Sequence, residues 1–230
     1  MHLKLSVVDD FVAKEVSVGE RKEALETVEM LWEVFGALEK KGFLRVTLRE
    51  SAERAKFMNI MRDFNKLTAA YNMLFHVFEK RGRSKEFAKH NKTFGFDEDG
   101  VAYMFLSESV ATVLRTTELF KNSFLYVLKT TRKKDAVFWP NMTLGELSRS
   151  LERITEGKSR RLMEKMDLKL RNALTHGLFW LEGSILVYCE DITLKEQKEI
   201  VVSELWIKGR AQSLTLLCLL AFIADYYHSV

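Results

Sequence analysis

The chain has 230 residues, of which 47% are hydrophobic and 30% charged, so it can bury one substantial core or two small ones and does not belong to the disordered class. Its 36 Lys and Arg residues against 32 Asp and Glu give a formal net charge of +4, which favours a polyanion only mildly and excludes a protein that coats nucleic acid. The two cysteines, Cys189 and Cys218, have no metal-ligand pattern around them, and we expect buried free thiols in a reducing cytoplasm.

We expect neither a secretory signal nor a membrane anchor. The chain reaches Asp9 and Asp10 before any long apolar stretch develops. The most apolar segment, Leu214–Ala224, is shorter than the roughly 20 residues that a spanning helix needs, which predicts a core helix instead. A soluble, cytoplasmic protein without a membrane partner is therefore expected.

The N-terminal part, residues 1–95, is predicted to be mainly helical, and its function is left open. Alternating apolar residues within 1–18 indicate a short strand or hairpin. A helix is predicted over 20–41, because apolar residues recur there at spacings of three and four, namely Leu25, Val28, Leu31, Trp32, Phe35 and Leu38. The same pattern predicts a second helix over 50–80, and a short basic helix is expected over 84–90.

The segment Phe94–Gly100 is rich in turn-forming residues and predicts a hairpin turn between strands at 93–96 and 101–106. Its acidic residues do not have the alternating spacing, or the glutamate six residues after the glycine, that a calcium loop needs. An ordinary turn is therefore expected there.

Residues 96–230 are predicted to form a second, mainly helical domain with a small hairpin. Helices are expected over 107–131, 143–156, 158–176 and 203–228, and a hairpin over 178–188. Thr143 and Glu146 have the spacing of a capping box. On the helix predicted over 158–176, Leu162, Met166, Leu170 and Leu174 repeat at every fourth residue, and Gly177 ends it.

The last turn of that helix carries the residues with the clearest chemistry, Arg171, Asn172 and His176. A guanidinium grips phosphate oxygens bidentately, and an imidazole moves protons near neutral pH. Positions five apart on a helix differ by about 140° around the axis and lie roughly 7.5 Å apart along it, so Arg171 must reach along the helix, or the last turn must loosen, for both groups to meet one phosphate. The pair predicts phosphodiester chemistry without a metal or cofactor.

In this chemistry, neutral His176 takes the proton of a ribose 2′-hydroxyl while Arg171 stabilises charge on the phosphate oxygens. The leaving 5′-oxygen also needs a proton, which one histidine cannot easily supply in the same step. A second copy from a twofold-related subunit is therefore expected.

The stretch Leu170–Gly177, at the end of a helix and followed by a hairpin and a closing helix, resembles the R-polar-x3-H motif of the HEPN (higher eukaryotes and prokaryotes nucleotide-binding) superfamily. The resemblance covers residues 107–230. It implies a helical bundle that dimerises around paired motifs and cleaves RNA, with Arg171 and His176 as the catalytic pair and Asn172 as the supporting polar residue. It also implies a defence or toxin-type role, in which an antitoxin or regulatory protein would be a partner.

One position departs from part of that family. In the branch whose antitoxin modifies a tyrosine two residues after the histidine, this position is Tyr, whereas here it is Leu178. The resemblance therefore does not extend to that silencing mechanism.

Other readings of the same residues stay open. One alternative is purely structural: Arg171 forms a surface ion pair, and His176 caps the C-terminus of the helix. Another is functional: the chain is a non-catalytic HEPN-type module that binds nucleotides, RNA or protein. A third alternative is a helical interaction protein whose motif is accidental.

Other histidines and the basic runs have plainer interpretations. His76 is expected to be a core or boundary residue, and His90 and His228 to lie at segment ends. The basic runs at 81–85, 132–134 and 158–161 are expected to be solvated helix ends, although they could also line an RNA path.

Overall fold

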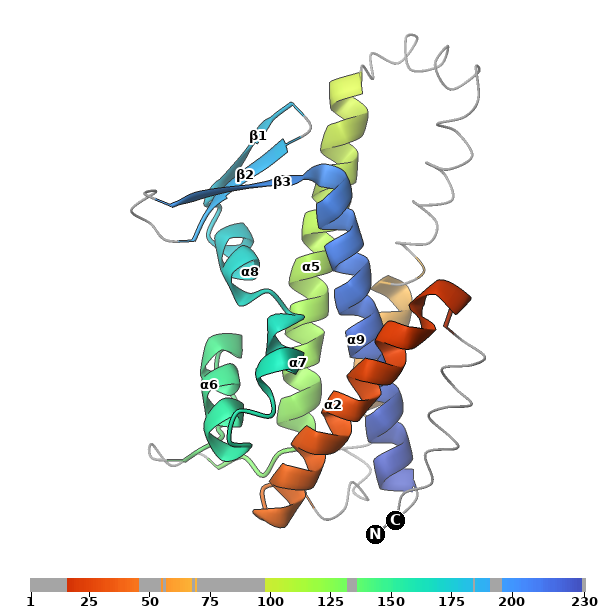
Figure 1. The fold of residues 1–230 in the computed structure, drawn as a ribbon, viewed down its shortest axis with the longest axis vertical. Coiled ribbons are helices and arrows are strands. Elements are labelled where there is room, and N and C mark those ends of the chain that lie inside the picture. Colours follow the sequence, from red (N-terminus) through yellow and green to blue (C-terminus); the bar gives the residue numbers. More distant parts are fainter. Residues whose placement is uncertain are drawn as a thin grey trace. The chain divides into compact units, whose positions relative to one another are not determined.

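A computed structural model of the chain describes residues 16–45, 55, 57–67, 69, 98–131, 136–183, 185–190 and 196–228. These residues are mainly helical with one small antiparallel sheet, as the sequence predicts (Figure 1). The chain forms two compact units: unit 1 comprises residues 1–61, 117–168 and 212–230, and unit 2 comprises 62–116 and 169–211. The boundary expected at residue 95 divides the chain differently and stays a prediction.

The first helix of unit 1, α2 (Arg21–Lys40), confirms the helix predicted over 20–41 and follows a short 3-10 turn, η1 (Val18–Glu20). Of the residues with this spacing, Val28, Leu31, Phe35 and Leu38 are buried. Leu25 shares the spacing, but its side chain is 41% exposed. Leu25 is rotated by about 100° from buried Ala24, which moves it off the apolar stripe.

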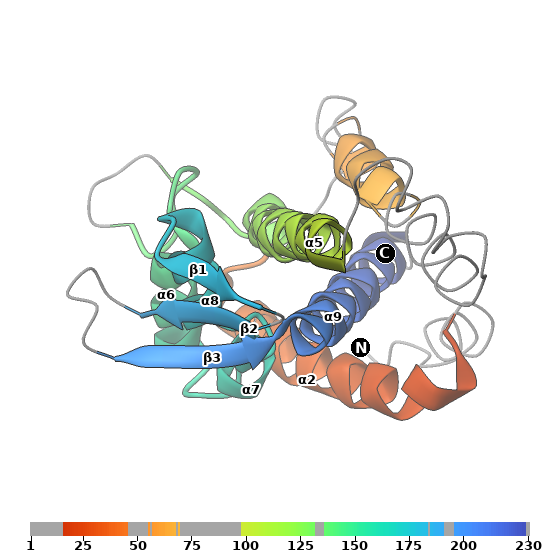
Figure 2. The ribbon, with the colours of Figure 1, turned by 90° about the horizontal axis from the view of Figure 1, so that it is seen from above.

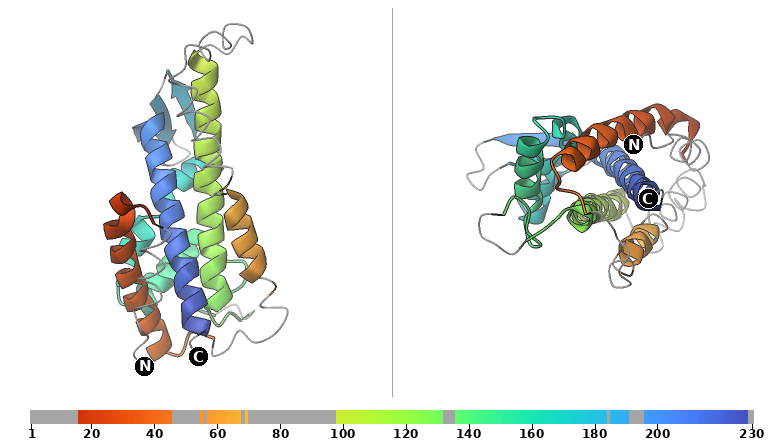
Figure 3. Two further views of the ribbon diagram at one scale, coloured as in Figure 1. Left: turned by 90° about the vertical axis from the view of Figure 1, so that its right-hand side faces the viewer. Right: turned by 90° about the horizontal axis from the view of Figure 1, so that it is seen from below.

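Aromatic rings form the centre of unit 1. The ring of Phe35 lies 5.8 Å from that of Phe124 on α5 (Glu98–Val127) and 4.8 Å from that of Phe222 on α9 (Val202–His228). The parts of α5 and α9 that belong to unit 1 lie side by side (Figure 3). Because Phe35 touches a ring on each of them, it fixes α2 against this helix pair.

The hairpin predicted around residues 93–106 is wrong for the part that the structure describes. Residues 98–106 are the first turns of α5, so no strand exists at 101–106. Acidic residues are favoured in the first turn of a helix, where backbone N–H groups carry partial positive charge. Glu98 and Asp99 are therefore typical of a helix start. The turn was predicted because glycines lie next to them in the sequence.

The helix α5 ends at Val127, earlier than the predicted Thr131, because the next residue joins a strand-like pairing. Leu44 and Leu128 form an isolated antiparallel bridge, in which Arg45 N–H donates to Val127 O at 2.9 Å and Lys129 N–H to Phe43 O at 2.8 Å. The bridge ties the chain after α2 to the end of α5.

Several predicted elements lie partly or wholly outside the described residues. The helix expected over 50–80 is present at residues 57–67, where Phe64 and Leu67 are buried, but its ends are not described. Most of the strand expected within 1–18 lies outside the described residues. The basic helix expected over 84–90 lies entirely outside them.

The capping box is confirmed at the start of α6 (Leu144–Ile154). Thr143 Oγ1 accepts a hydrogen bond from Glu146 N–H at 3.2 Å, and Thr143 N–H donates to Glu146 Oε2 at 2.7 Å. This reciprocal pair satisfies two backbone groups that a helix start leaves without an internal partner.

The single helix predicted over 158–176 is wrong, because the structure has two helices there, α7 (Arg160–Glu164) and α8 (Leu168–Thr175). Residues repeating at every fourth position drift by about 40° per step, so these four would spread over about 120° of a straight helix, a width that an apolar face can also bury. The chain instead breaks at Asp167, which has φ +41°, and Leu162, Met166, Leu170 and Leu174 are all buried. Gln212 Nε2 donates to Met166 O at 3.0 Å and so satisfies a carbonyl group at the break.

Unit 2 contains the predicted hairpin and a strand that the sequence analysis missed. The strands β1 (Phe179–Glu182), β2 (Ile185–Cys189) and β3 (Gln197–Val201) pair antiparallel in this order (Figure 2). The first three residues of β3 are polar or charged, and four of its five residues are exposed, so it lacks the apolar alternation of a half-buried strand. One core cluster joins α8 to this sheet and to the parts of α5 and α9 in unit 2, through Leu106, Val113, Leu170, Ala173, Leu174, Leu186, Tyr188, Ile200, Val202 and Leu205.

The closing helix α9 confirms the helix predicted over 203–228. Residues Val202–Tyr227 are long and apolar enough to cross a membrane, judged by length and composition alone. In the most apolar part of this segment, 56% is buried inside the protein. One helix of this kind is weak evidence for a membrane span, because a mostly buried core helix meets the same criterion. Gly209 permits a close approach of α5, because a Cβ atom there would lie 3.4 Å from Thr112 Cγ2.

Candidate functional site

Arg171 and Asn172 lie next to each other on α8, and their side chains are in contact. Arg171 Nη1 donates a hydrogen bond to Asn172 Oδ1 at 3.2 Å. Arg171 is half-buried, with its Nε atom shielded from solvent, whereas Asn172 is exposed. The amide oxygen therefore holds the guanidinium at the edge of the protein surface.

His176 follows the last residue of α8 and is exposed. Its backbone N–H donates to Asn172 O at 3.0 Å, which closes the last turn of the helix. Gly177 then adopts φ +67°, and Leu178 N–H donates back to Ala173 O at 2.9 Å. This is the Schellman ending of a helix, which glycine favours because it has no Cβ atom.

Asn172 is the residue that both of the other motif residues contact. Its side chain accepts from Arg171, and its backbone carbonyl accepts from His176. Arg171, Asn172 and His176 therefore lie within the last turn of α8 and the residue that follows it. The spacing of five residues does not by itself put Arg171 and His176 on the same face of the helix.

The opposite side of α8 is anchored in the core. Leu170 and Ala173 are 0% exposed and Leu174 is 4% exposed. Because these residues fix the rotation of the helix, Asn172 and Thr175 are turned towards solvent. Thr175 Oγ1 also donates to Arg171 O, one helical turn back, at 2.8 Å.

Ion pairs surround the carboxylate that follows β2. Glu190 Oε2 lies 2.6 Å from Lys169 Nζ, and Glu190 Oε1 pairs with Lys198 Nζ. Hydrogen bonds from these two lysines lower the pKa of Glu190 below its ordinary value. The carboxylate is therefore ionised and held by lysines at neutral pH, and it adds little net negative charge beside the motif helix.

The basic run at 158–161 was expected to lie on the motif helix, and this is wrong. Arg160 and Arg161 begin α7, and the break at Asp167 separates them from α8. Arg160 forms an ion pair with Glu152, which raises the pKa of the guanidinium. Arg161 is exposed at the surface of unit 1.

The remaining candidates have plain positions or are not described. His228 is the last residue of α9, as expected for a segment end. His76, His90 and the basic runs at 81–85 and 132–134 lie outside the described residues. Cys189 and Cys218 are free and buried, as predicted, and burial raises the pKa of the Cys218 thiol to about 12, which keeps it protonated at neutral pH.

Within the described part of the chain, no three His, Cys, Asp or Glu residues are grouped so that they could hold a metal ion. The position of His176 fits both interpretations of the motif, since a C-cap histidine can be structural and an exposed one can also reach a substrate. No family model, curated protein or solved structure matches this chain.

Proposed function

We propose that the protein is a metal-independent endoribonuclease of HEPN type, which acts in the cytoplasm as a homodimer. The observation that carries this proposal is the exposed imidazole of His176 at the end of α8, with Arg171 and Asn172 joined by a hydrogen bond on the preceding turn. A proton-transferring group and a phosphate-binding group thus share one short, core-anchored segment.

The proposed reaction starts at the ribose 2′-hydroxyl. Neutral His176 removes its proton, and the 2′-oxygen attacks the adjacent phosphorus. The bond from phosphorus to the 5′-oxygen breaks, and the products are a 2′,3′-cyclic phosphate and a 5′-hydroxyl end. The guanidinium of Arg171 stabilises the negative charge that gathers on the non-bridging oxygens.

Asn172 acts as a positioning residue in this proposal. Its amide oxygen accepts from Arg171 Nη1, and this contact sets the direction of the guanidinium that would bind the phosphate. Loss of this contact would add rotational freedom to the arginine without removing its charge.

The second subunit supplies the other proton. A protonated His176 of a twofold-related copy gives its proton to the leaving 5′-oxygen, so that each active site uses both copies of the motif. Cleavage per mole of protein should therefore fall when the protein is diluted below the dissociation constant of the dimer.

The test is cleavage of a mixed-sequence RNA in the presence of a chelator by the wild type, His176→Ala and Arg171→Ala. Cleavage by the wild type alone, with cyclic phosphate ends identified by mass spectrometry, supports the proposal. Arg161→Ala is the matched control, because it removes one exposed guanidinium from another helix. Equal cleavage by the wild type and His176→Ala would contradict the proposed role of the histidine.

The same assay separates the non-catalytic alternative. If the wild type and His176→Ala bind the RNA equally and neither cleaves it, the motif belongs to a binding module. If neither binds, an interaction protein with an accidental motif is the remaining interpretation.

A further inference from the structure

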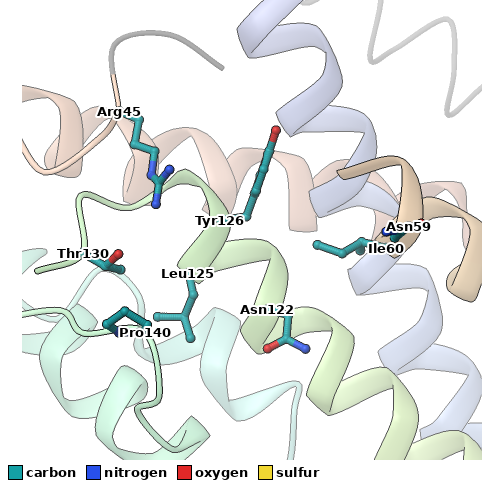
Figure 4. Close-up of a pocket in the computed structure, with 8 residues that line it drawn as sticks. All are labelled: Arg45, Asn59, Ile60, Asn122, Leu125, Tyr126, Thr130 and Pro140. Atoms are coloured by element: carbon teal, nitrogen blue, oxygen red, sulfur yellow. The ribbon is translucent and has the colours of Figure 1, made fainter. Parts of the chain in front are cut away.

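An open pocket of about 410 Å³ lies in unit 1 (Figure 4). The described residues that line it, among them Arg45 and Pro140, belong to unit 1, whereas the motif residues belong to unit 2. The pocket therefore has no motif residue among its described walls. A candidate extension of the proposed active site lies instead on the motif helix α8.

This helix carries a further cation, Lys169, on the same side as two of the motif residues. Lys169, Asn172 and His176 follow one another at spacings of three and four, and all three are exposed. Successive residues of an α-helix turn by about 100°, so these positions lie within about 60° of one another around the axis. His176 continues the row, because its N–H donates to Asn172 O, four residues back, at 3.0 Å. One exposed side of α8 therefore presents an ammonium, an amide and an imidazole.

Lys169 is held by the carboxylate that follows β2. Lys169 Nζ lies 2.6 Å from Glu190 Oε2, and Lys198 of β3 pairs with the other carboxylate oxygen. The Glu190 side chain is 13% exposed, whereas the Lys169 side chain is 67% exposed. The carboxylate thus anchors the ammonium, and the lysine stays accessible from solvent. Because an ammonium has three N–H donors, a lysine that binds a carboxylate can also bind a phosphate.

The separation of Lys169 from His176 fits two phosphates better than one. Seven residues of an α-helix span roughly 10 Å along the axis, which is much more than the size of one phosphate group. A nucleic-acid strand carries a negative charge at every nucleotide. A strand that has its scissile phosphate at His176 and follows this side of α8 therefore brings another phosphate to Lys169.

We propose that Lys169 is a substrate-binding residue, which contacts a phosphate next to the scissile one. The inference rests on the proposed nuclease activity and deepens it, because the substrate becomes an RNA strand with at least two consecutive phosphates. Lys169 does not touch the reacting atoms in this arrangement. Its loss should therefore raise KM and leave kcat almost unchanged.

The test compares two substrates that differ in length. The shorter is a dinucleotide with one phosphodiester bond, and the longer is the same dinucleotide extended by one 2′-deoxynucleotide on each side. Each has a single ribose 2′-hydroxyl, next to the bond that is cut. Lys169→Gln should lower kcat/KM for the longer substrate by about five- to tenfold, through KM, and leave the dinucleotide almost unchanged. An equal loss on both substrates, or no loss on either, would overturn the inference.

A binding measurement separates failure of this inference from failure of the nuclease proposal. The probe is the longer strand with 2′-deoxyribose throughout, which cannot be cut because the attacking hydroxyl is absent. Lys169→Gln should weaken its binding by the same factor and lower the salt dependence by about one phosphate contact. If the wild type cuts no RNA, the nuclease proposal fails, and weaker binding by Lys169→Gln still supports the phosphate contact. Unchanged binding, or no binding by the wild type, would overturn that contact.

Two further variants identify the cause of a loss. Lys169→Arg keeps the positive charge and should retain most of the wild-type KM. Lys41→Gln is the matched control, because Lys41 is an exposed lysine of unit 1 that also pairs with a glutamate, Glu156. Equal weakening by Lys41→Gln and Lys169→Gln would mean that only net charge matters, and the assigned contact would be wrong.

Discussion

The ends of α2 and α8 are built alike and present different groups. At the end of α2, Lys41 N–H donates to Ala37 O at 3.2 Å, Gly42 has φ +74°, and Phe43 N–H donates to Leu38 O at 2.9 Å. At the end of α8, His176 N–H donates to Asn172 O at 3.0 Å, Gly177 has φ +67°, and Leu178 N–H donates to Ala173 O at 2.9 Å. The same glycine-dependent ending thus occurs in both units.

The side chains at these ends differ in what surrounds them. Lys41 Nζ lies 2.5 Å from Glu156 Oε1, and Lys129 Nζ donates to Gly42 O at 2.8 Å, so an ion pair and a side-chain hydrogen bond lie at the end of α2. The end of α8 carries an exposed histidine beside the contact between Arg171 and Asn172. A helix ending by itself is therefore structural, and its chemistry depends on the residue at the cap and on its neighbours.

The largest effect that we expect is a difference in RNA cleavage rate between the variants His176→Ala and Lys41→Ala. Removal of a general base costs about a hundredfold to ten-thousandfold in rate, so His176→Ala should lose nearly all cleavage. Lys41→Ala changes the equivalent cap of α2 and should keep the wild-type rate. The rates are measured on one RNA in chelator, with melting curves to show that both variants fold, and loss of cleavage in both would remove the distinction between the two ends.

A large effect on stability is expected for the buried side of each helix. Leu170 and Leu38 are both 0% exposed, and truncation of a buried leucine to alanine costs about 2 to 5 kcal/mol. Leu170→Ala and Leu38→Ala should each lower the free energy of unfolding by this amount in urea denaturation. A loss below about 1 kcal/mol in either variant would show that the site repacks without the leucine.

A moderate effect is expected for Gly177→Ala and Gly42→Ala. An added Cβ atom at either position meets nothing within 4 Å, so only the positive φ opposes the change, which costs about 1 to 2 kcal/mol. Both variants should lose similar stability in urea, and Gly177→Ala alone should also slow cleavage, because it disturbs the residue after His176. Equal slowing by Gly42→Ala would point to a general loss of folded protein.

The smallest effect is expected from the carboxylates Glu190 and Glu156, whose pKa values are both lowered by lysines. Because the folded-state pKa is depressed, each ion pair stabilises the protein above the ordinary value of 4.5, and this contribution is lost as the pH falls through the lowered pKa. Glu190→Gln should therefore lower the melting temperature at neutral pH, and the difference from the wild type should vanish in acid.

Glu156→Gln provides the comparison at the end of α2. The Glu156 side chain is 75% exposed and that of Glu190 is 13% exposed, so solvent and salt screen Glu156 more strongly. We expect a smaller change in melting temperature for Glu156→Gln than for Glu190→Gln. The change for Glu156→Gln should also disappear at a lower salt concentration. A larger change for Glu156→Gln would contradict this ranking by exposure.

Helices with a clear apolar stripe and an end signal were predictable from the sequence. The spacing of Val28, Leu31, Phe35 and Leu38 identified α2, and Thr143 with Glu146 identified the start of α6. Errors arose where one local pattern fits two structures, as at Glu98 and Asp99, whose acidic and glycine-rich surroundings indicate either a turn or a helix start. The strand β3 carries mostly exposed polar residues and gave no periodic signal.

The sequence by itself determined that Arg171, Asn172 and His176 stand together before a helix-stopping glycine, because spacing and end signals are local properties of the chain. The spacing of Leu170 and Leu174 also indicated the buried side of this helix, and both residues are buried. Only the tertiary structure decided that α8 is separate from α7, because the chain breaks at Asp167. The pocket at Arg45 also depends on tertiary structure, because its walls come from stretches far apart in the chain that meet only through the bridge between Leu44 and Leu128 and the packing around it.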